Sequence, residues 1–245
     1  MNRQTAMRIR CLDLDRLDPH SGPYDAVVVI DVLRSFSTAA YAFAAGARRI
    51  HPVETIAEAH RLQRHLPEAL TTGAVGGGAP IVGFDYGNSP SALHGSDLGG
   101  RTLIQSTAAG VRGLGRFAGA RALFAGSLVC AAATAKAIRR LQPDEVVLVV
   151  TGKWVDRDGD EDRACADYLA ALLHGDSSAP MPDPTPYVQR VRDSDFGRRF
   201  LAGTDPNLPP ADLDLCARAN CFDFAMPVRQ QDGLRVLLAE TCAGN

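Results

Sequence analysis

Long apolar runs are missing from this chain of 245 residues. No stretch approaches the roughly 18 uncharged apolar residues that a membrane-spanning helix needs. The N-terminal segment MNRQTAMRIRCLDLDRL has no apolar core of the kind found in signal peptides. We therefore expect neither a membrane span nor secretion, and we predict a cytoplasmic protein.

Cysteine pairs and basic clusters are also missing. The six cysteines include no pair separated by two residues, which is the spacing typical of zinc sites. They fall mostly in apolar segments, so we interpret them as buried reduced thiols and not as disulfides. The net charge is −2 and no basic stripe with interleaved aromatic residues occurs. We therefore predict no nucleic-acid partner and no binding to anionic membranes.

Several catalytic signatures are absent as well. The chain has no His-Glu-x-x-His zinc motif, no Gly-x-Ser-x-Gly nucleophile turn and no Walker sequence ending in Gly-Lys-Ser/Thr. Leu33 stands where phosphatases of the haloacid dehalogenase type need a second aspartate after Asp31. A hydrophobic content of 46% with 22% charged residues nevertheless predicts a folded globular protein.

Strands and helices alternate through most of the chain. Short apolar, β-branched runs predict strands at 26–31, 48–53, 69–74, 101–106, 121–125 and 145–150. Helical periodicity predicts helices at 55–66, 127–141 and 160–174. This alternation predicts an α/β fold with a mostly parallel or mixed sheet, covered by helices on both faces.

The domain organisation follows from the position of one linker. We predict a single domain over residues 1–245, and two merged halves joined near 175–186 are left open. The segment 175–186, GDSSAPMPDPTP, has four prolines among small polar residues. After it, 187–217 is polar and helical, and MPVRQQDGLRVLLAE predicts a closing hairpin that turns at Gln231-Asp232-Gly233.

The first polar cluster follows the strand at 26–31. That strand ends in Asp31, Arg34 follows, and an Ala-rich helix begins among Ser35, Ser37 and Thr38, which can cap it. A carboxylate at a strand end can hold a divalent cation, and an arginine can bind a phosphate or carboxylate. The ordinary alternative is a structural Asp–Arg pair or a helix cap.

The second cluster is the glycine-rich segment GAVGGGAPIVGFDYGNSP, residues 73–90. Its glycines allow backbone N–H groups to converge on an anion, and Asp85, Asn88 and Ser89 follow them. A mobile surface loop explains the glycine content equally well.

The third cluster, QSTAAGVRG, follows the strand at 101–106. Ser106 and Thr107 can donate hydroxyl groups, the turn before Gly110 exposes N–H groups, and Arg112 can reach the same anion. A plain helix N-cap is the alternative.

The fourth cluster, TGKWVDRDGDEDRAC, follows the strand at 145–150. Lys153 lies just past the strand end, and Glu161 and Asp162 begin the next helix. Acidic residues in a first turn often only complement the helix dipole. A calcium loop is disfavoured, because Asp167 stands where such a loop needs a bidentate glutamate.

Taken together and in this order, the clusters resemble the 2-phosphosulfolactate phosphatase family. The stretches that carry the resemblance are VVVIDVLRSFST with AFAAGA, GFDYGNSPSAL, STAAGVRG, AGSLVCA, EDRACADYL and DLDLCARANCFDFAMPV. They span most of residues 24–230. The resemblance implies a three-layer α/β/α fold and a Mg²⁺-dependent phosphatase, which removes phosphate from 2-phospho-3-sulfolactate on the route to coenzyme M.

Site residues are carried over from the resemblance by position. It implies metal or general acid/base roles for the carboxylates Asp31, Asp85, Glu161 and Asp162. It implies anion binding by Arg34, Arg112 and Lys153. It implies phosphate or sulfonate binding by Asn88, Ser89, Ser106, Thr107 and the Gly110 turn. A substrate with phosphate, carboxylate and sulfonate groups suits several cations around one metal.

Two positions depart from the family pattern. Gly73-Ala74 stands where the family usually has Gly-Glu, and Ala108-Ala109-Gly110-Val111 stands where it usually has Thr-Asn-Gly-Thr.

From the resemblance we predict a Mg²⁺-dependent phosphoric monoester hydrolase acting on 2-phospho-3-sulfolactate or a related phosphorylated hydroxy acid. The alternative is a catalytically weakened relative that only binds a small anionic ligand. The expected partner is this small molecule, and a homodimer is left open.

Overall fold

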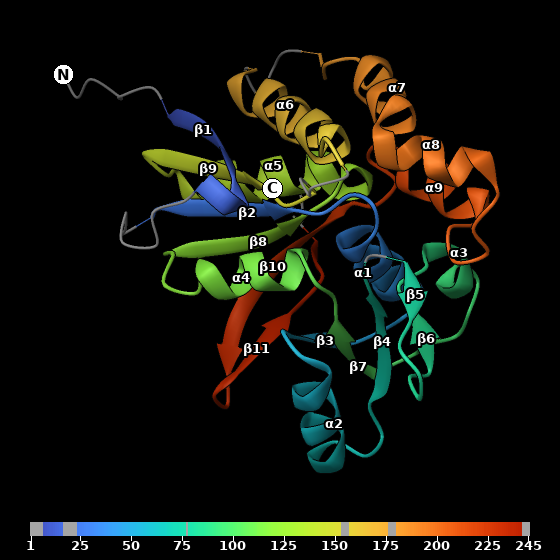
Figure 1. Ribbon diagram of the computed structural model, residues 1–245. Coiled ribbons are helices and arrows are strands. Elements are labelled where there is room, and N and C mark those ends of the chain that lie inside the picture. The colour runs from blue at the N-terminus through green and yellow to red at the C-terminus, as the bar shows by residue number, and fades with distance from the viewer. Residues whose placement is uncertain (1–6, 17–23, 77, 153–156, 176–179, 242–245) are drawn as a thin grey trace.

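The structure, a computed structural model, describes residues 7–16, 24–76, 78–152, 157–175 and 180–241. These residues form one sheet of 12 strands in the order β1–β9–β2–β8–β10–β11–β3–β7–β4–β5, with β12 against β10 and β6 against β4. All six strands predicted from the sequence are present, and so is the mixed sheet of an α/β fold. The sheet contains two parallel parts joined by an antiparallel hairpin (Figure 1).

The first parallel part holds the strands that lead to Asp31 and to Gly152. Its members are β1 (Arg8–Asp13), β9 (Glu145–Val150), β2 (Ala26–Ile30) and β8 (Ala122–Gly126). Successive residues of a strand point to opposite faces of a sheet. Val28 and Ile30 accordingly lie in one apolar cluster and Val27 and Val29 in another, so both faces of β2 are buried.

The second parallel part supplies the other side of the pocket described below. It contains β3 (Arg49–Val53), β7 (Thr102–Ser106), β4 (Leu70–Val75) and β6 (Tyr86–Gly87), with the short β5 (Ala79–Pro80) folded back antiparallel on β4. The joining hairpin consists of β10 (Phe224–Gln231) and β11 (Leu234–Leu237), and β12 (Glu240–Thr241) pairs with β10. It turns at Asp232 and Gly233, which both have positive φ, as the sequence predicted.

Helices cover both faces of the first part, which gives three layers (Figure 1). On one face lie α5 (Ala131–Leu141) and α6 (Asp160–His174), and the 3-10 turn η2 (Leu128–Cys130) precedes α5. Beyond them on the same face lie α7 (Thr185–Asp193), α8 (Asp195–Ala202) and α9 (Pro210–Cys216). On the other lie α1 (Ser35–Ala44), α3 (Pro90–Leu93) and α4 (Gly110–Arg116). Helix α2 (Ile56–His65) packs on the second part, and the 3-10 turn η1 (Leu14–Arg16) follows β1. The predicted helices at 55–66, 127–141 and 160–174 are confirmed. The predicted linker at 175–186 lies partly outside the described residues.

Candidate active site

A cavity of about 340 Å³ opens where the carboxyl ends of strands from both parallel parts meet. Asp31 follows β2, Gly152 follows β9, Ala74 lies at the end of β4 and Thr107 follows β7. All four line the cavity. Ligands of α/β proteins bind outside the carboxyl ends of strands, and a cavity of this size suits a small molecule. We call it the strand-end pocket.

Asp31 lies at the wall of the strand-end pocket and receives the amides of two helix starts. Its Oδ1 accepts from the Ser35 amide at 2.9 Å, where α1 begins, and its Oδ2 accepts from the Gly110 amide at 3.0 Å, where α4 begins. The sequence had predicted capping of α1 by hydroxyl side chains, and this is wrong, since the carboxylate of Asp31 takes that amide. Burial raises the pKa of Asp31, while the bonds from Ser35 and Gly110 and the charge of Arg157 oppose the rise.

Asp162 ties the strand ends of the first part together. Its Oδ1 accepts from the Val32 amide at 2.8 Å, and its Oδ2 accepts from the amides of Thr151 and Gly152 at 3.0 and 2.7 Å and from the Thr151 hydroxyl at 3.2 Å. Burial, and secondly the charge of Asp31, raises the pKa of Asp162 to about 7. Both of its oxygens are therefore already used in fixing the backbone after β2 and β9.

Glu161 is buried beside Asp162, and one of its carboxylate oxygens has no hydrogen-bond partner among the described residues. Only 1% of its surface is exposed, and its Oε2 has no hydrogen-bond partner among the residues that the structure describes. Burial, and then the charge of Asp162, raises the pKa of Glu161 well above its ordinary value. A buried polar atom without a partner is costly, so a group that is unsatisfied in the protein alone points to a ligand, a water or an ion.

Gly152 allows these carboxylates to approach the pocket wall. A Cβ atom at this position would lie 2.6 Å from Glu161 Oε1 and 3.1 Å from Asp162 Oδ2, the first closer than real contacts allow. At Gly110, likewise, a Cβ atom would lie 2.9 Å from Asp31 Oδ2. Glycine at these two positions is thus required for the close packing of carboxylates against backbone.

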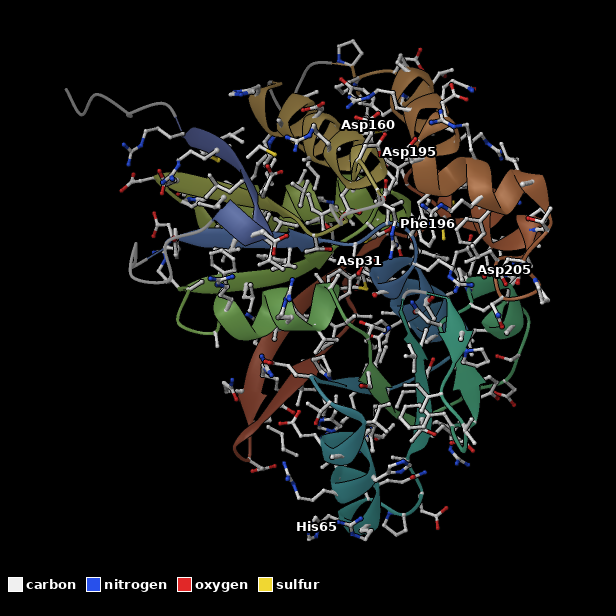
Figure 2. The ribbon with its side chains drawn as sticks, viewed as in Figure 1. Asp31, His65, Asp160, Asp195, Phe196 and Asp205 are labelled. Carbon is white, nitrogen blue, oxygen red and sulfur yellow. The ribbon has the colours of Figure 1, made fainter. Side chains whose placement is uncertain are left out.

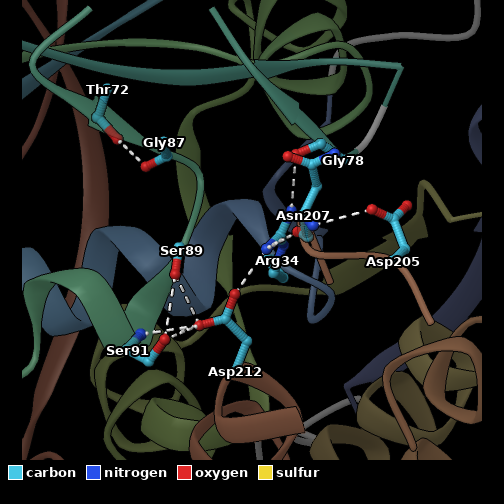
Figure 3. A network of polar contacts seen from close by, with 9 residues as sticks. All are labelled: Arg34, Thr72, Gly78, Gly87, Ser89, Ser91, Asp205, Asn207 and Asp212. Atoms are coloured by element: carbon cyan, nitrogen blue, oxygen red, sulfur yellow. Dashed lines mark hydrogen bonds and ion pairs between the residues drawn. The ribbon is translucent and has the colours of Figure 1, made fainter. Parts of the chain in front are cut away.

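Arg34 lines the pocket and is the centre of a network that joins four segments (Figure 3). Its guanidinium forms an ion pair with Asp212 of α9 at 2.6 Å and donates to the carbonyl oxygens of Asn207 at 3.0 Å and Gly78 at 3.3 Å. The other oxygen of Asp212 accepts from the Ser89 hydroxyl at 2.8 Å and from the amide and hydroxyl of Ser91 at 2.9 and 2.6 Å. Arg34 therefore holds the pocket wall together in addition to facing the cavity.

Four further residues of the predicted set lie at or beside the strand-end pocket. Asn88 and Thr107 line it. The Oδ1 of Asn88 is buried and has no partner in the described part of the chain, and the Thr107 hydroxyl accepts from the Ser35 hydroxyl at 3.0 Å. Ser106 is buried at the end of β7, and Ser89 bonds to Asp212.

Two of the predicted site residues lie away from the strand-end pocket. Asp85 accepts from the amide and hydroxyl of Thr71, at 2.7 and 2.8 Å, and so fixes the glycine-rich segment onto β4. Arg112 points away and forms a surface ion pair with Asp15 at 3.3 Å. Neither belongs to the described residues that line the pocket. Lys153 lies outside the described residues.

Residues 12–231 match the model of the family described as 2-phosphosulpholactate phosphatase. The chain belongs to this family. A Bacillus subtilis protein named "Probable 2-phosphosulfolactate phosphatase" is 31% identical over 208 residues, which cover 85% of this chain and 89% of the relative. A protein of the same name from Carboxydothermus hydrogenoformans is 36% identical over 223 residues, 86% of this chain and 90% of the relative.

In this member of the 2-phosphosulpholactate phosphatase family, part of the pocket wall comes from residues that the sequence did not single out, although one of them, Arg157, lies inside the fourth polar cluster. These residues are Arg157, Phe196, Arg199, Asp205 and Leu208. Phe196 and Asp205 lie in the same region of the molecule as Asp31, far from His65 at the end of α2 (Figure 2). The polar helical pattern of 187–217 resembled an ordinary solvated surface, so it gave no signal of a site.

Metal ligands are not preassembled in the described residues, where no group of three or more His, Cys, Asp or Glu side chains could hold an ion. Mg²⁺, however, usually keeps several waters and takes only one or two carboxylates together with substrate phosphate. Asp31 could serve as such a ligand because it lines the pocket, and Glu161 because its Oε2 has no hydrogen-bond partner among the described residues. Among the described helices, none combines the length and apolar character of a membrane span.

Proposed function

We propose that this protein is a Mg²⁺-dependent phosphatase that hydrolyses small anionic phosphate monoesters, with 2-phospho-3-sulfolactate as the first candidate substrate. Membership of the 2-phosphosulpholactate phosphatase family supports the reaction. The observation that carries the proposal is the strand-end pocket itself, where a buried carboxylate, Asp31, lies on a wall that also presents Arg34 and Arg157.

The charges in and around the pocket suit phosphoryl transfer, in which catalysis is mostly positioning and electrostatic stabilisation. Asp31 and Glu161 would hold Mg²⁺, which when bound neutralises phosphoryl oxygens and lowers the pKa of water. Asp162 fixes the backbone amides after β2 and β9, so that both strand ends keep their positions. Arg157, whose charge acts on Asp31 and Glu161, would bind phosphoryl oxygens beside them.

The side chains from the second parallel part would orient the ester. Asn88 offers a buried amide at the pocket wall, and Thr107 offers a hydroxyl held by Ser35. Such short polar groups at fixed positions place a phosphate without adding charge. They would contact the phosphoryl group from the second parallel part while Arg157 binds it beside the carboxylates, which positions it for attack by water.

The competing proposal is binding of a small anion without turnover. It is supported by the three alanines of the pocket wall, Ala74, Ala108 and Ala109, which offer no side-chain donor or ligand. Release of phosphate from p-nitrophenyl phosphate and from 2-phospho-3-sulfolactate, with and without Mg²⁺, separates the two. Mg²⁺-dependent release supports the phosphatase, and binding of either compound without release supports the alternative.

Asp31→Asn tests the residue at the centre of the proposal. The amide keeps the shape and one acceptor oxygen but removes the charge, so we expect turnover to fall by about a hundredfold or more, since metal-assisted charge stabilisation contributes several kcal/mol. Asp15→Asn is the control, because Asp15 is exposed and forms a surface ion pair with Arg112. Circular dichroism and thermal melts test whether both variants fold. Unchanged activity and Mg²⁺ dependence in a folded Asp31→Asn protein would exclude the assigned role.

A further inference from the structure

Phe196 brings two arginines together at the strand-end pocket. The ring of this buried α8 residue has the Arg157 guanidinium carbon at 4.1 Å from its centroid and that of Arg199 at 5.9 Å. All three residues line the pocket. Stacking on a ring engages the flat face of a guanidinium, whereas acid groups bind its donor edge, so an arginine can make both contacts.

The two arginines lie at different depths. Arg157 is half-buried, and its charge partly opposes the rise that burial causes in the pKa of Asp31 and of Glu161. Arg199, one turn along α8 from Phe196, is exposed and lies at the mouth of the pocket. A ligand whose phosphate lies beside Asp31 therefore meets Arg157 first and extends toward Arg199.

The described pocket wall contains more arginines than carboxylates. The described pocket residues include the arginines Arg34, Arg157 and Arg199 and the carboxylates Asp31 and Asp205. Asp205 accepts from the Asn207 amide at 2.8 Å and so shapes the turn that follows α8. Arg34 is already paired with Asp212, so of the described pocket arginines Arg157 and Arg199, which share the Phe196 ring, are the ones suited to a second acid group.

We propose that Arg199, held on Phe196 beside Arg157, forms a second anion subsite and determines specificity by binding the carboxylate or sulfonate of the substrate. The inference rests on the proposed phosphatase activity and names a residue that recognises its substrate. Arg199 acts on specificity, binding the carboxylate or sulfonate of the substrate, while the phosphoryl group stays beside Asp31. The preference of the enzyme should thus rise with each acid group that the ester carries.

Three esters of graded charge test this subsite. Isopropyl phosphate has no further acid group, 2-phospholactate replaces one of its methyl groups by a carboxylate, and 2-phospho-3-sulfolactate adds a sulfonate. We expect the kcat/KM of the wild-type enzyme to rise along this series. In Arg199→Ala, the ratio of kcat/KM for the charged esters to that for isopropyl phosphate should fall about tenfold to a hundredfold, the range for one lost charge-assisted hydrogen bond.

Two further variants separate charge from structure. Arg199→Lys keeps the charge and should restore part of the ratio. Arg198→Ala removes the neighbouring exposed arginine of α8, which lies outside the described pocket wall and pairs with Asp195, and it should leave the ratio unchanged. An equal loss on all three esters in Arg199→Ala would mean a structural role for Arg199 and would overturn the proposal.

Binding measurements keep the subsite testable if no ester is hydrolysed. Calorimetry with 3-sulfolactate, which has two acid groups and no phosphate, should show weaker binding to Arg199→Ala than to the wild-type protein. A wild-type protein that hydrolyses none of the esters but loses 3-sulfolactate affinity on this substitution refutes the phosphatase and supports the subsite. Equal affinities refute the subsite.

Discussion

The buried ion pair between Arg34 and Asp212 offers a sharp test of how the pocket is held together. Asp212 is fully buried and accepts four hydrogen bonds, from Arg34, the Ser89 hydroxyl and the amide and hydroxyl of Ser91. In Asp212→Asn the Arg34 charge stays buried without its counter-charge, and removal of one partner of a buried pair costs about 3–5 kcal/mol. Because domains are stable by about 5–15 kcal/mol, the variant should fold but be clearly weakened.

The measurement is urea unfolding together with a thermal melt. For a chain of this size about 2–4 °C of Tm corresponds to 1 kcal/mol, so Asp212→Asn should lower the Tm by about 6–20 °C. Asp214→Asn is the control on the same helix, because Asp214 pairs with Arg192 at 2.8 Å on the exposed side of α9. Exposed pairs contribute about 0.2–1 kcal/mol, and the control should change the Tm by only a few degrees.

A double-mutant cycle then decides whether the cost comes from the pair. Arg34→Met combined with Asp212→Asn removes the stranded charge, so the double variant should be more stable than the sum of the single losses predicts, by about 1–3 kcal/mol. Additive losses, or an Asp212→Asn protein no weaker than Asp214→Asn, would refute the view that this ion pair fixes the pocket wall.

Three other predictions follow from the carboxylates and the glycine beside them. Because burial raises the pKa of Glu161, ionisation of this side chain destabilises the metal-free fold as the pH rises above the ordinary value of about 4.5. Glu161→Gln should therefore be more stable than wild type at pH 8 in EDTA, by a margin that shrinks toward pH 4.5. Urea titrations at several pH values check this, and a pH-independent difference contradicts it. Gly152→Ala should lower both Tm and turnover, since its Cβ would lie 2.6 Å from Glu161 Oε1, whereas Gly119→Ala, with open space around it, should change neither. Ala74→Glu adds a carboxylate to the pocket wall and should lower the Mg²⁺ concentration needed for half-maximal activity, and a lost fold with no such gain speaks against the idea.

The sequence by itself determined the elements that depend on neighbouring residues. The apolar run at 26–30 becomes β2, with both faces buried, and Asp31 lies at its end as expected. The helix at 160–174 and the turn at Asp232-Gly233 follow from local periodicity and from residues that tolerate positive φ. The polar residues Asp31, Asn88 and Thr107 line the pocket together, since parallel strands end at a common edge.

Only the tertiary structure decided which of these residues meet. Arg34 lies three positions from Asp31 but pairs with Asp212, 178 residues away, and the Val32 amide bonds to Asp162 across 130 residues. Asp85 and Arg112 stand in promising motifs yet bond to Thr71 and Asp15. The order and direction of the strands and the packing of the helices set these long-range contacts, and no local pattern encodes them. For the same reason, the sequence did not predict that the Phe196 ring of α8 lies at the pocket with Arg157 and Arg199 beside it.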